Sequence, residues 1–137
     1  MPKPAIPKEI QTQVETIVSE FNRAHFSKPE RGYLARFRGQ FLYLDRCDCG
    51  WPPSDGEPFQ VCRLAYQGKL DNWEFAIYRH SKERYDPNEW LFPGDRFVDG
   101  TVQGAMKAGL EAYPVLQDTP QTKILRTIFR ALTKKGR

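Results

Sequence analysis

Three cysteines and one histidine are the residues whose types best suit them to hold a metal ion. Thiolates and imidazole nitrogens are the usual ligands of tetrahedral zinc. The candidate set is Cys47, Cys49, Cys62 and His80. Only the first two cysteines are close in sequence, whereas common zinc motifs use two close pairs of ligands. We therefore favour the alternative that Cys62 is a small buried apolar residue in a strand and that the other two cysteines lie at a strand end. On this interpretation the protein has no cofactor.

Catalytic chemistry has little support elsewhere in the chain. The two histidines, His25 and His80, fall at the ends of expected elements, and the sequence has no glycine-rich phosphate loop. Carboxylates gather in two loops, where they could bind a hard cation or transfer protons. They are Asp45, Asp48, Asp55 and Glu57 in the first loop region, and Glu83, Asp86, Glu89 and Asp95 in the second. Acidic loops are commonplace, so we expect no catalytic residue and favour a binding module over an enzyme.

Arginines and aromatic rings on neighbouring strands give the most specific functional signal. Arg36 and Arg38 are two residues apart and share one side of a strand, and Arg46 and Arg63 fall on the next two strands. The rings that we expect between them are Tyr33, Phe37, Tyr43 and Tyr66. Basic side chains neutralise phosphates while rings stack on bases. The pattern predicts contact with nucleic acid through a basic-aromatic sheet face. The alternative is that the rings belong to the core and the arginines are a solvated face.

The excess positive charge of the chain is confined to its end. Residues 120–137 contain six basic side chains and no acidic one. They are Lys123, Arg126, Arg130, Lys134, Lys135 and Arg137, and the first five join the predicted nucleic-acid surface. Without them, 15 basic and 17 acidic residues remain in 1–119, so the net charge of +4 does not describe the body. The basic isoelectric point alone is therefore weak support for a nucleic-acid ligand.

The same terminal segment is an expected amphipathic helix. Its apolar residues recur with helical spacing on one face: Ile124, Leu125, Ile128, Phe129 and Leu132. Such a helix can lie on an anionic membrane surface, on nucleic acid or on a partner protein. We favour packing of its apolar stripe on the body or on a second subunit. A rival hypothesis follows, in which the chain is a homo-oligomeric or partner-assembly protein without catalytic activity and without a nucleic-acid ligand.

Composition sets the broad class of the protein. The 137 residues are 39% hydrophobic, 28% charged and 13% aromatic, which is typical of one soluble domain with a modest core. No apolar run approaches the roughly 20 residues that span a bilayer, and no secretory signal follows the first methionine. An odd number of cysteines fits a reducing compartment. We expect a cytoplasmic protein without an integral membrane segment.

Hydrophobic periodicity predicts an α+β fold. It indicates a helix over 7–25, strands over 33–38, 41–46, 59–66 and 73–79, and helices over 101–112 and 120–134. The fold would be an N-terminal helix, a four-stranded antiparallel sheet of two hairpins with one covered and one wetter face, and two C-terminal helices. We divide the chain into a single α+β domain, 1–119, and the basic amphipathic helix, 120–137.

Two further expectations concern the segment after the sheet. The long loop over 81–100 is rich in aromatic residues, which favours packing by its own side chains over a functional role. The helix over 101–112 contains Gly104 and Gly109, each costing about 1 kcal/mol relative to alanine. We expect a close approach of this helix to the sheet to offset that cost. Asp99 or Thr101 would cap its first turn.

Overall fold

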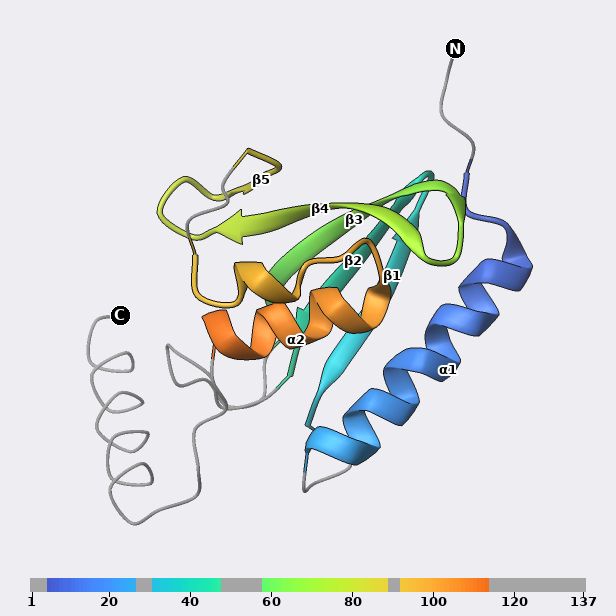
Figure 1. Cartoon of the computed structure of the whole chain (residues 1–137), viewed down its shortest axis with the longest axis horizontal. Coiled ribbons are helices and arrows are strands. Elements are labelled where there is room, and N and C mark those ends of the chain that lie inside the picture. The colour runs from blue at the N-terminus through green and yellow to red at the C-terminus, as the bar shows by residue number, and fades with distance from the viewer. Residues whose placement is uncertain (1–4, 27–30, 48–57, 89–91, 114–137) are drawn as a thin grey trace, which may run out of the picture.

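The computed structural model describes residues 5–26, 31–47, 58–88 and 92–113. Within them the chain forms two layers, an antiparallel sheet and two helices packed against it (Figure 1). The elements in chain order are α1 (Lys8–His25), β1 (Tyr33–Arg38), β2 (Phe41–Arg46), β3 (Phe59–Lys69), β4 (Asn72–Arg79), β5 (Arg84–Asp86), the 3-10 helix η1 (Asp95–Phe97) and α2 (Val102–Ala112). The predicted helix within 120–137 lies outside the described residues.

The sheet has five strands, not the four that the sequence predicts. Their spatial order is β1-β2-β3-β4-β5, with every neighbouring pair antiparallel. The additional strand, β5, falls in the segment predicted to be a loop, where Tyr85 pairs with Tyr78 of β4. The second hairpin is also tighter than predicted, because β3 continues through an irregularity between Tyr66 and Lys69.

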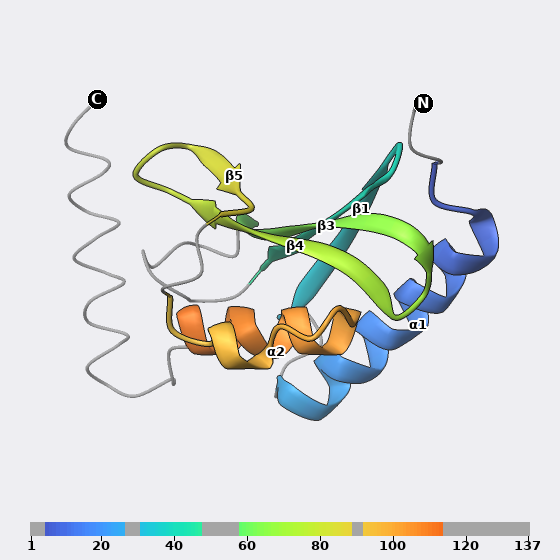
Figure 2. The same cartoon turned by 45° about the horizontal axis from the view of Figure 1, so that its top comes forward.

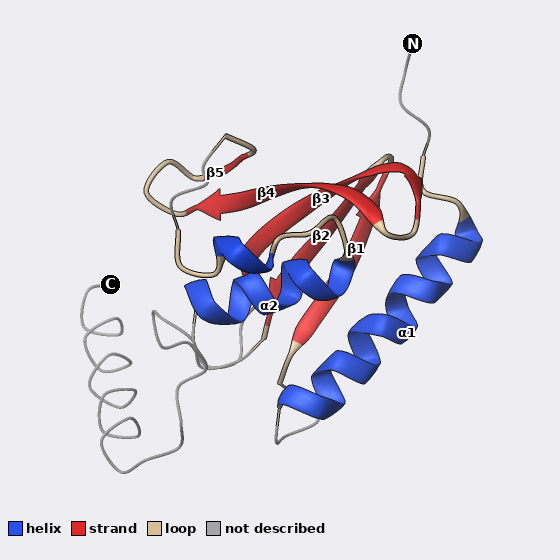
Figure 3. Ribbon diagram, viewed as in Figure 1, coloured by secondary structure: helices blue, strands red, loops and turns tan. Residues whose placement is uncertain are grey.

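One face of the sheet is covered and the other carries no helix of the described chain. Figures 2 and 3 show α1 and α2 on the same side of the strands. The covered face is apolar and includes Leu42, Leu44, Leu64, Phe75 and Ile77. From α1, Val14, Val18 and Phe21 are buried at the 3.6-residue spacing that defines its apolar side. The predicted division into a covered and a wetter face is therefore confirmed.

The expected close approach of α2 to the sheet is confirmed at Gly109. A Cβ there would overlap the Tyr33 hydroxyl and lie 2.7 Å from Cγ1 of Val61. The hydroxyl cannot easily give way, because it donates a buried 2.7 Å hydrogen bond to the Met106 carbonyl. Gly104 is close to Asp99 and Phe97 instead of the sheet.

The first turn of α2 is capped as expected. The Thr101 hydroxyl accepts a 2.9 Å hydrogen bond from the Gly104 amide. Asp99 in turn accepts hydrogen bonds from the Thr101 amide and hydroxyl, at 3.0 and 2.6 Å. The two residues that the sequence offers as alternative caps therefore act together.

The polar side of α1 also contacts the sheet, through Asn22. The side-chain amide of Asn22 accepts a 2.7 Å hydrogen bond from the Tyr33 N–H and donates a 2.9 Å hydrogen bond to the Tyr33 carbonyl. Tyr33 begins β1, one of the two edge strands of the sheet. Asn22 thereby fixes the C-terminal part of α1 beside the sheet.

The segment after β4 is packed down in part by its own rings, as expected. Phe92 stacks on Phe75 with 5.6 Å between ring centroids. Tyr85 differs, since it enters the sheet as part of β5. Of the helices described, none combines the length and apolar character needed to cross a membrane.

Candidate nucleic-acid interface

Strand register brings arginines and rings together on the helix-free face. Arg36 of β1 lies opposite Tyr43 of β2, which lies opposite Arg63 of β3. Arg38 lies opposite Phe41. Cross-strand partners share a face, and successive side chains along a strand alternate between faces. We therefore define the open face as the strand positions that point away from α1 and α2. These are Leu34, Arg36, Arg38, Phe41, Tyr43, Asp45, Arg63, Ala65, Glu74, Ala76, Tyr78 and Tyr85.

Arg36 is held in place by a carboxylate and a ring. Its Nε donates a 2.8 Å hydrogen bond to Oδ2 of Asp45, and its Nη2 lies 3.5 Å from Oδ1. Its Cζ lies 4.7 Å from the centroid of Tyr43. The hydrogen bond to Asp45 raises the pKa of the guanidinium above its ordinary value. The Arg36 side chain is nevertheless 54% exposed, whereas that of Asp45 is 11% exposed.

Arg63 is surrounded differently, by rings without a carboxylate. Its Cζ lies 4.4 Å from the centroid of Phe41 and 5.4 Å from that of Tyr85. The side chain is half-buried on the central strand. Among the described residues it has neither an ion-pair partner nor a hydrogen-bond acceptor. A half-buried cation that meets ring faces but no counter-ion favours the approach of an anion.

Tyr85 links the rings of the open face. Its ring centroid lies 5.3 Å from that of Tyr43 and 4.9 Å from that of Tyr78. Burial, and to a lesser degree the negative charge of Asp45, raises the pKa of Tyr85 to about 12. Its hydroxyl is buried near Arg36 yet has no hydrogen bond of acceptable geometry in the described part of the chain. The ring is therefore a neutral, largely apolar wall of the site.

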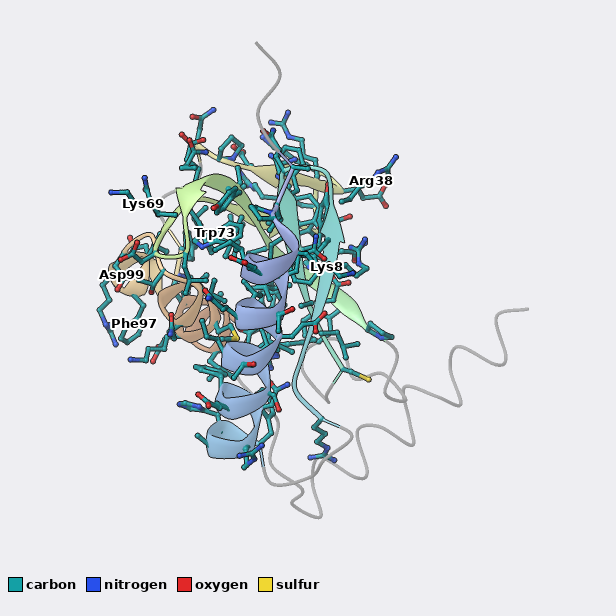
Figure 4. All side chains as sticks on the ribbon, turned by 90° about the vertical axis from the view of Figure 1, so that its right-hand side faces the viewer. Lys8, Arg38, Lys69, Trp73, Phe97 and Asp99 are labelled. Carbon is teal, nitrogen blue, oxygen red and sulfur yellow. The ribbon has the colours of Figure 1, made fainter. Side chains whose placement is uncertain are left out.

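Arg38 extends the cationic side chains toward the end of β1. It is exposed and projects away from the side on which Phe97 and Asp99 lie (Figure 4). The open face also carries the acidic Asp45 and Glu74, so its three arginines are partly offset. The face is moderately cationic, with Arg36 compensated locally and Arg38 and Arg63 not in contact with a described carboxylate.

Arg46 does not lie on this face, contrary to the sequence prediction. It is fully buried, and its Nη1 donates hydrogen bonds to the carbonyls of Gly109, over 3.2 Å, and Tyr113. Three rings surround its Cζ at 5.5–5.8 Å: Phe26, Tyr33 and Phe59. The physical reason is strand alternation, because Arg46 shares the covered side of β2 with Leu42 and Leu44.

The predicted rings are also divided between the two faces. Tyr33 and Tyr66 are buried in the core, and Phe37 packs against it from the covered side. Tyr43 alone of the four lies on the open face. The rings that sequence reasoning missed there are Phe41, Tyr78 and Tyr85. Phe41 could have been found, since it alternates in phase with Tyr43.

The cysteines do not come together as a metal site in the described residues. Cys62 is fully buried in β3, which confirms the interpretation of it as a buried apolar residue. Burial raises the pKa of its thiol, so the thiol stays protonated and ligates poorly. Cys47 is half-buried, and His80 Nε2 lies 3.1 Å from the Gln60 carbonyl. No group of three potential ligands occurs in the described ranges. Cys49 lies outside them, so the full four-residue set remains a hypothesis.

The basic tail, Lys123, Arg126, Arg130, Lys134 and Lys135, lies outside the residues that the structure describes. Comparisons with protein-family models, curated proteins and solved structures find no match to this chain. The open face is therefore the feature from which a function can be inferred.

Proposed function

We propose that the protein is a small non-catalytic binding module whose open face contacts nucleic acid. The observation that supports this function best is the gathering of Arg36, Arg38 and Arg63 with aromatic rings on the one sheet face without a helix. Nucleic acid is the polyanion that also presents planar rings, so it can use both kinds of side chain. The tail over 120–137 would add sequence-independent phosphate contacts.

The rival function is assembly with a second copy or a protein partner. It is favoured by Leu34, which is 45% exposed on the open face and is the one large apolar side chain of the described residues with such exposure. A stable protein interface usually buries about 800 Å² on each partner around an apolar centre. One exposed leucine beside arginines offers little of this area. We therefore prefer the nucleic-acid ligand.

The test is a titration of the full chain against labelled mixed-sequence DNA and RNA at two salt concentrations. In the face variant, Arg36, Arg38 and Arg63 are changed to glutamine. In the tail variant, Lys123, Arg126, Arg130 and Lys134 are changed to glutamine. A matched control removes three charges from the helical side through Lys8→Gln, Arg23→Gln and Lys107→Gln, all at exposed positions.

We expect salt-sensitive binding that the face variant loses and the helical-side control retains. If the tail variant loses binding and the face variant retains it, the contact is made by a charged appendage, and the proposal is contradicted. No binding at low salt would also contradict it. In that case, a stable dimer in sedimentation that ignores both polyanions would support the rival function.

A further inference from the structure

Arg36 and Arg63 differ in which part of the guanidinium is left for a ligand. Around Arg63, the rings of Phe41 and Tyr85 lie within cation–π range. Its N–H donors have no acceptor among the described residues. A guanidinium presents five N–H donors in a planar fork that matches two oxygens of a phosphate. The edge of Arg63 is therefore available, in a position that the two rings restrict.

Arg36 presents the opposite arrangement. Two of its three nitrogens, Nε and Nη2, point toward the carboxylate of Asp45. One side of its plane lies over the Tyr43 ring. Asp45 compensates its charge, yet 54% of the side chain is exposed. What Arg36 offers a ligand is mainly the second side of its plane, on which a nucleobase can stack.

We infer that the open face binds a single strand, with Arg63 holding a backbone phosphate by its edge and Arg36 stacking a base on its face. The inference rests on the proposed function and adds the form of the ligand and the role of each arginine. Tyr43 and Asp45 keep the Arg36 plane in place. Arg38, exposed two residues further along β1, is placed to contact a neighbouring phosphate.

Single-stranded nucleic acid fits this arrangement better than a duplex. A base can stack on Arg36 only if its own face is free, and base faces are free where bases are unpaired. Duplex DNA is read by a helix or a two-stranded ribbon that enters the major groove. The open face presents a broad layer of five strands, with no helix of the described chain on that side.

The experiment compares two probes of equal length with the full chain. One is a twelve-residue oligothymidylate and the other is a twelve-residue strand of abasic sites. We expect the wild type to bind the thymidylate about tenfold more tightly, which corresponds to one stacked base. Arg36→Gln should remove this preference for bases, because the plane on which a base stacks is lost. Arg63→Gln should weaken binding of both probes equally. It should also make the negative slope of log K against log salt less steep by about 0.7.

Arg36→Lys gives a second variant, because it keeps the charge and removes the plane. It should lose the preference for bases as Arg36→Gln does. The inference is overturned if Arg36→Gln weakens binding of both single-stranded probes alike, as Arg63→Gln should. It is also overturned if a duplex of the same length binds more tightly than the thymidylate. If the wild type binds none of the three probes, the proposed function itself fails. Both side chains are partly exposed, so unfolding curves should show that each variant remains folded.

Discussion

The guanidinium of Arg46 in β2 donates a 3.2 Å hydrogen bond to the carbonyl oxygen of Gly109 in the last turn of α2. The same nitrogen donates to the carbonyl of Tyr113, the C-cap residue of that helix. The last carbonyls of a helix carry its negative dipole end. The Gly109 carbonyl also accepts a 2.8 Å hydrogen bond from the Tyr113 amide. The sheet therefore supplies a cationic cap to the helix that packs on it.

Replacing Arg46 by methionine should lower the free energy of unfolding by about 1–3 kcal/mol, because the Tyr113 carbonyl loses its donor and the Gly109 carbonyl keeps only the Tyr113 N–H. Urea unfolding followed by circular dichroism measures the loss. Arg38→Met, at an exposed position, is the matched control and should change stability by about 0.5 kcal/mol or less. Equal stabilities of the two variants would contradict the capping role of Arg46.

Gly109→Ala should destabilise the protein despite the higher helix propensity of alanine. The propensity gain is about 1 kcal/mol. The added methyl group would meet the fixed Tyr33 hydroxyl and Val61, and overpacking of this kind costs about 1–3 kcal/mol. We expect a net loss measurable by thermal unfolding. Gln103→Ala, at an exposed position of α2, should be neutral. A Gly109→Ala protein more stable than the wild type would disprove the close contact.

Removal of the Tyr33 hydroxyl and removal of the Tyr85 hydroxyl should have different effects on the stability of the fold. The Tyr33 hydroxyl donates a buried hydrogen bond to Met106, so Tyr33→Phe should cost about 1–2 kcal/mol. The Tyr85 hydroxyl is buried without such a bond within the described residues, so Tyr85→Phe should be neutral or stabilising. Denaturant unfolding of the two single variants measures both effects. A larger loss in Tyr85→Phe than in Tyr33→Phe would show that the Tyr85 hydroxyl has an acceptor.

The cap of α2 should weaken in acid. The hydrogen bond from the Thr101 side chain lowers the pKa of Asp99 below its ordinary value. A lowered pKa in the folded state gives stability that is complete above the unfolded value of about 3.9 and is lost as pH falls through the folded value. The advantage of the wild type over Asp99→Asn should therefore shrink as pH falls below about 4. Thermal unfolding across this range tests it, and a pH-independent difference would contradict it.

Helices and long strands were predictable because each repeats a pattern over several residues. The bounds of β1 and β2 match the prediction, and α1 and α2 differ from it by one residue at their starts. β5 was missed because three residues are too few to show an alternation. Its place depends on pairing with β4, which local sequence does not reveal.

The site was predictable only in part, for a similar reason. Alternation correctly placed Arg36, Arg38 and Tyr43 on one side of the hairpin. The same alternation places Arg46 with Leu42, but its charge led us to expect it at the surface. Its partners, Gly109 and Tyr113, are 63 and 67 residues away, so no local pattern could show that its charge is satisfied inside the core.

The amide of Asn22 also covers the start of the β1 edge of this sheet. An exposed edge strand invites pairing with strands of other molecules, and that pairing underlies fibril growth and precipitation. Asn22 occupies both backbone groups of Tyr33 that an incoming strand would need there. A single side chain on α1 thus helps to keep the folded protein a discrete particle, and its loss would expose a starting point for uncontrolled polymerisation.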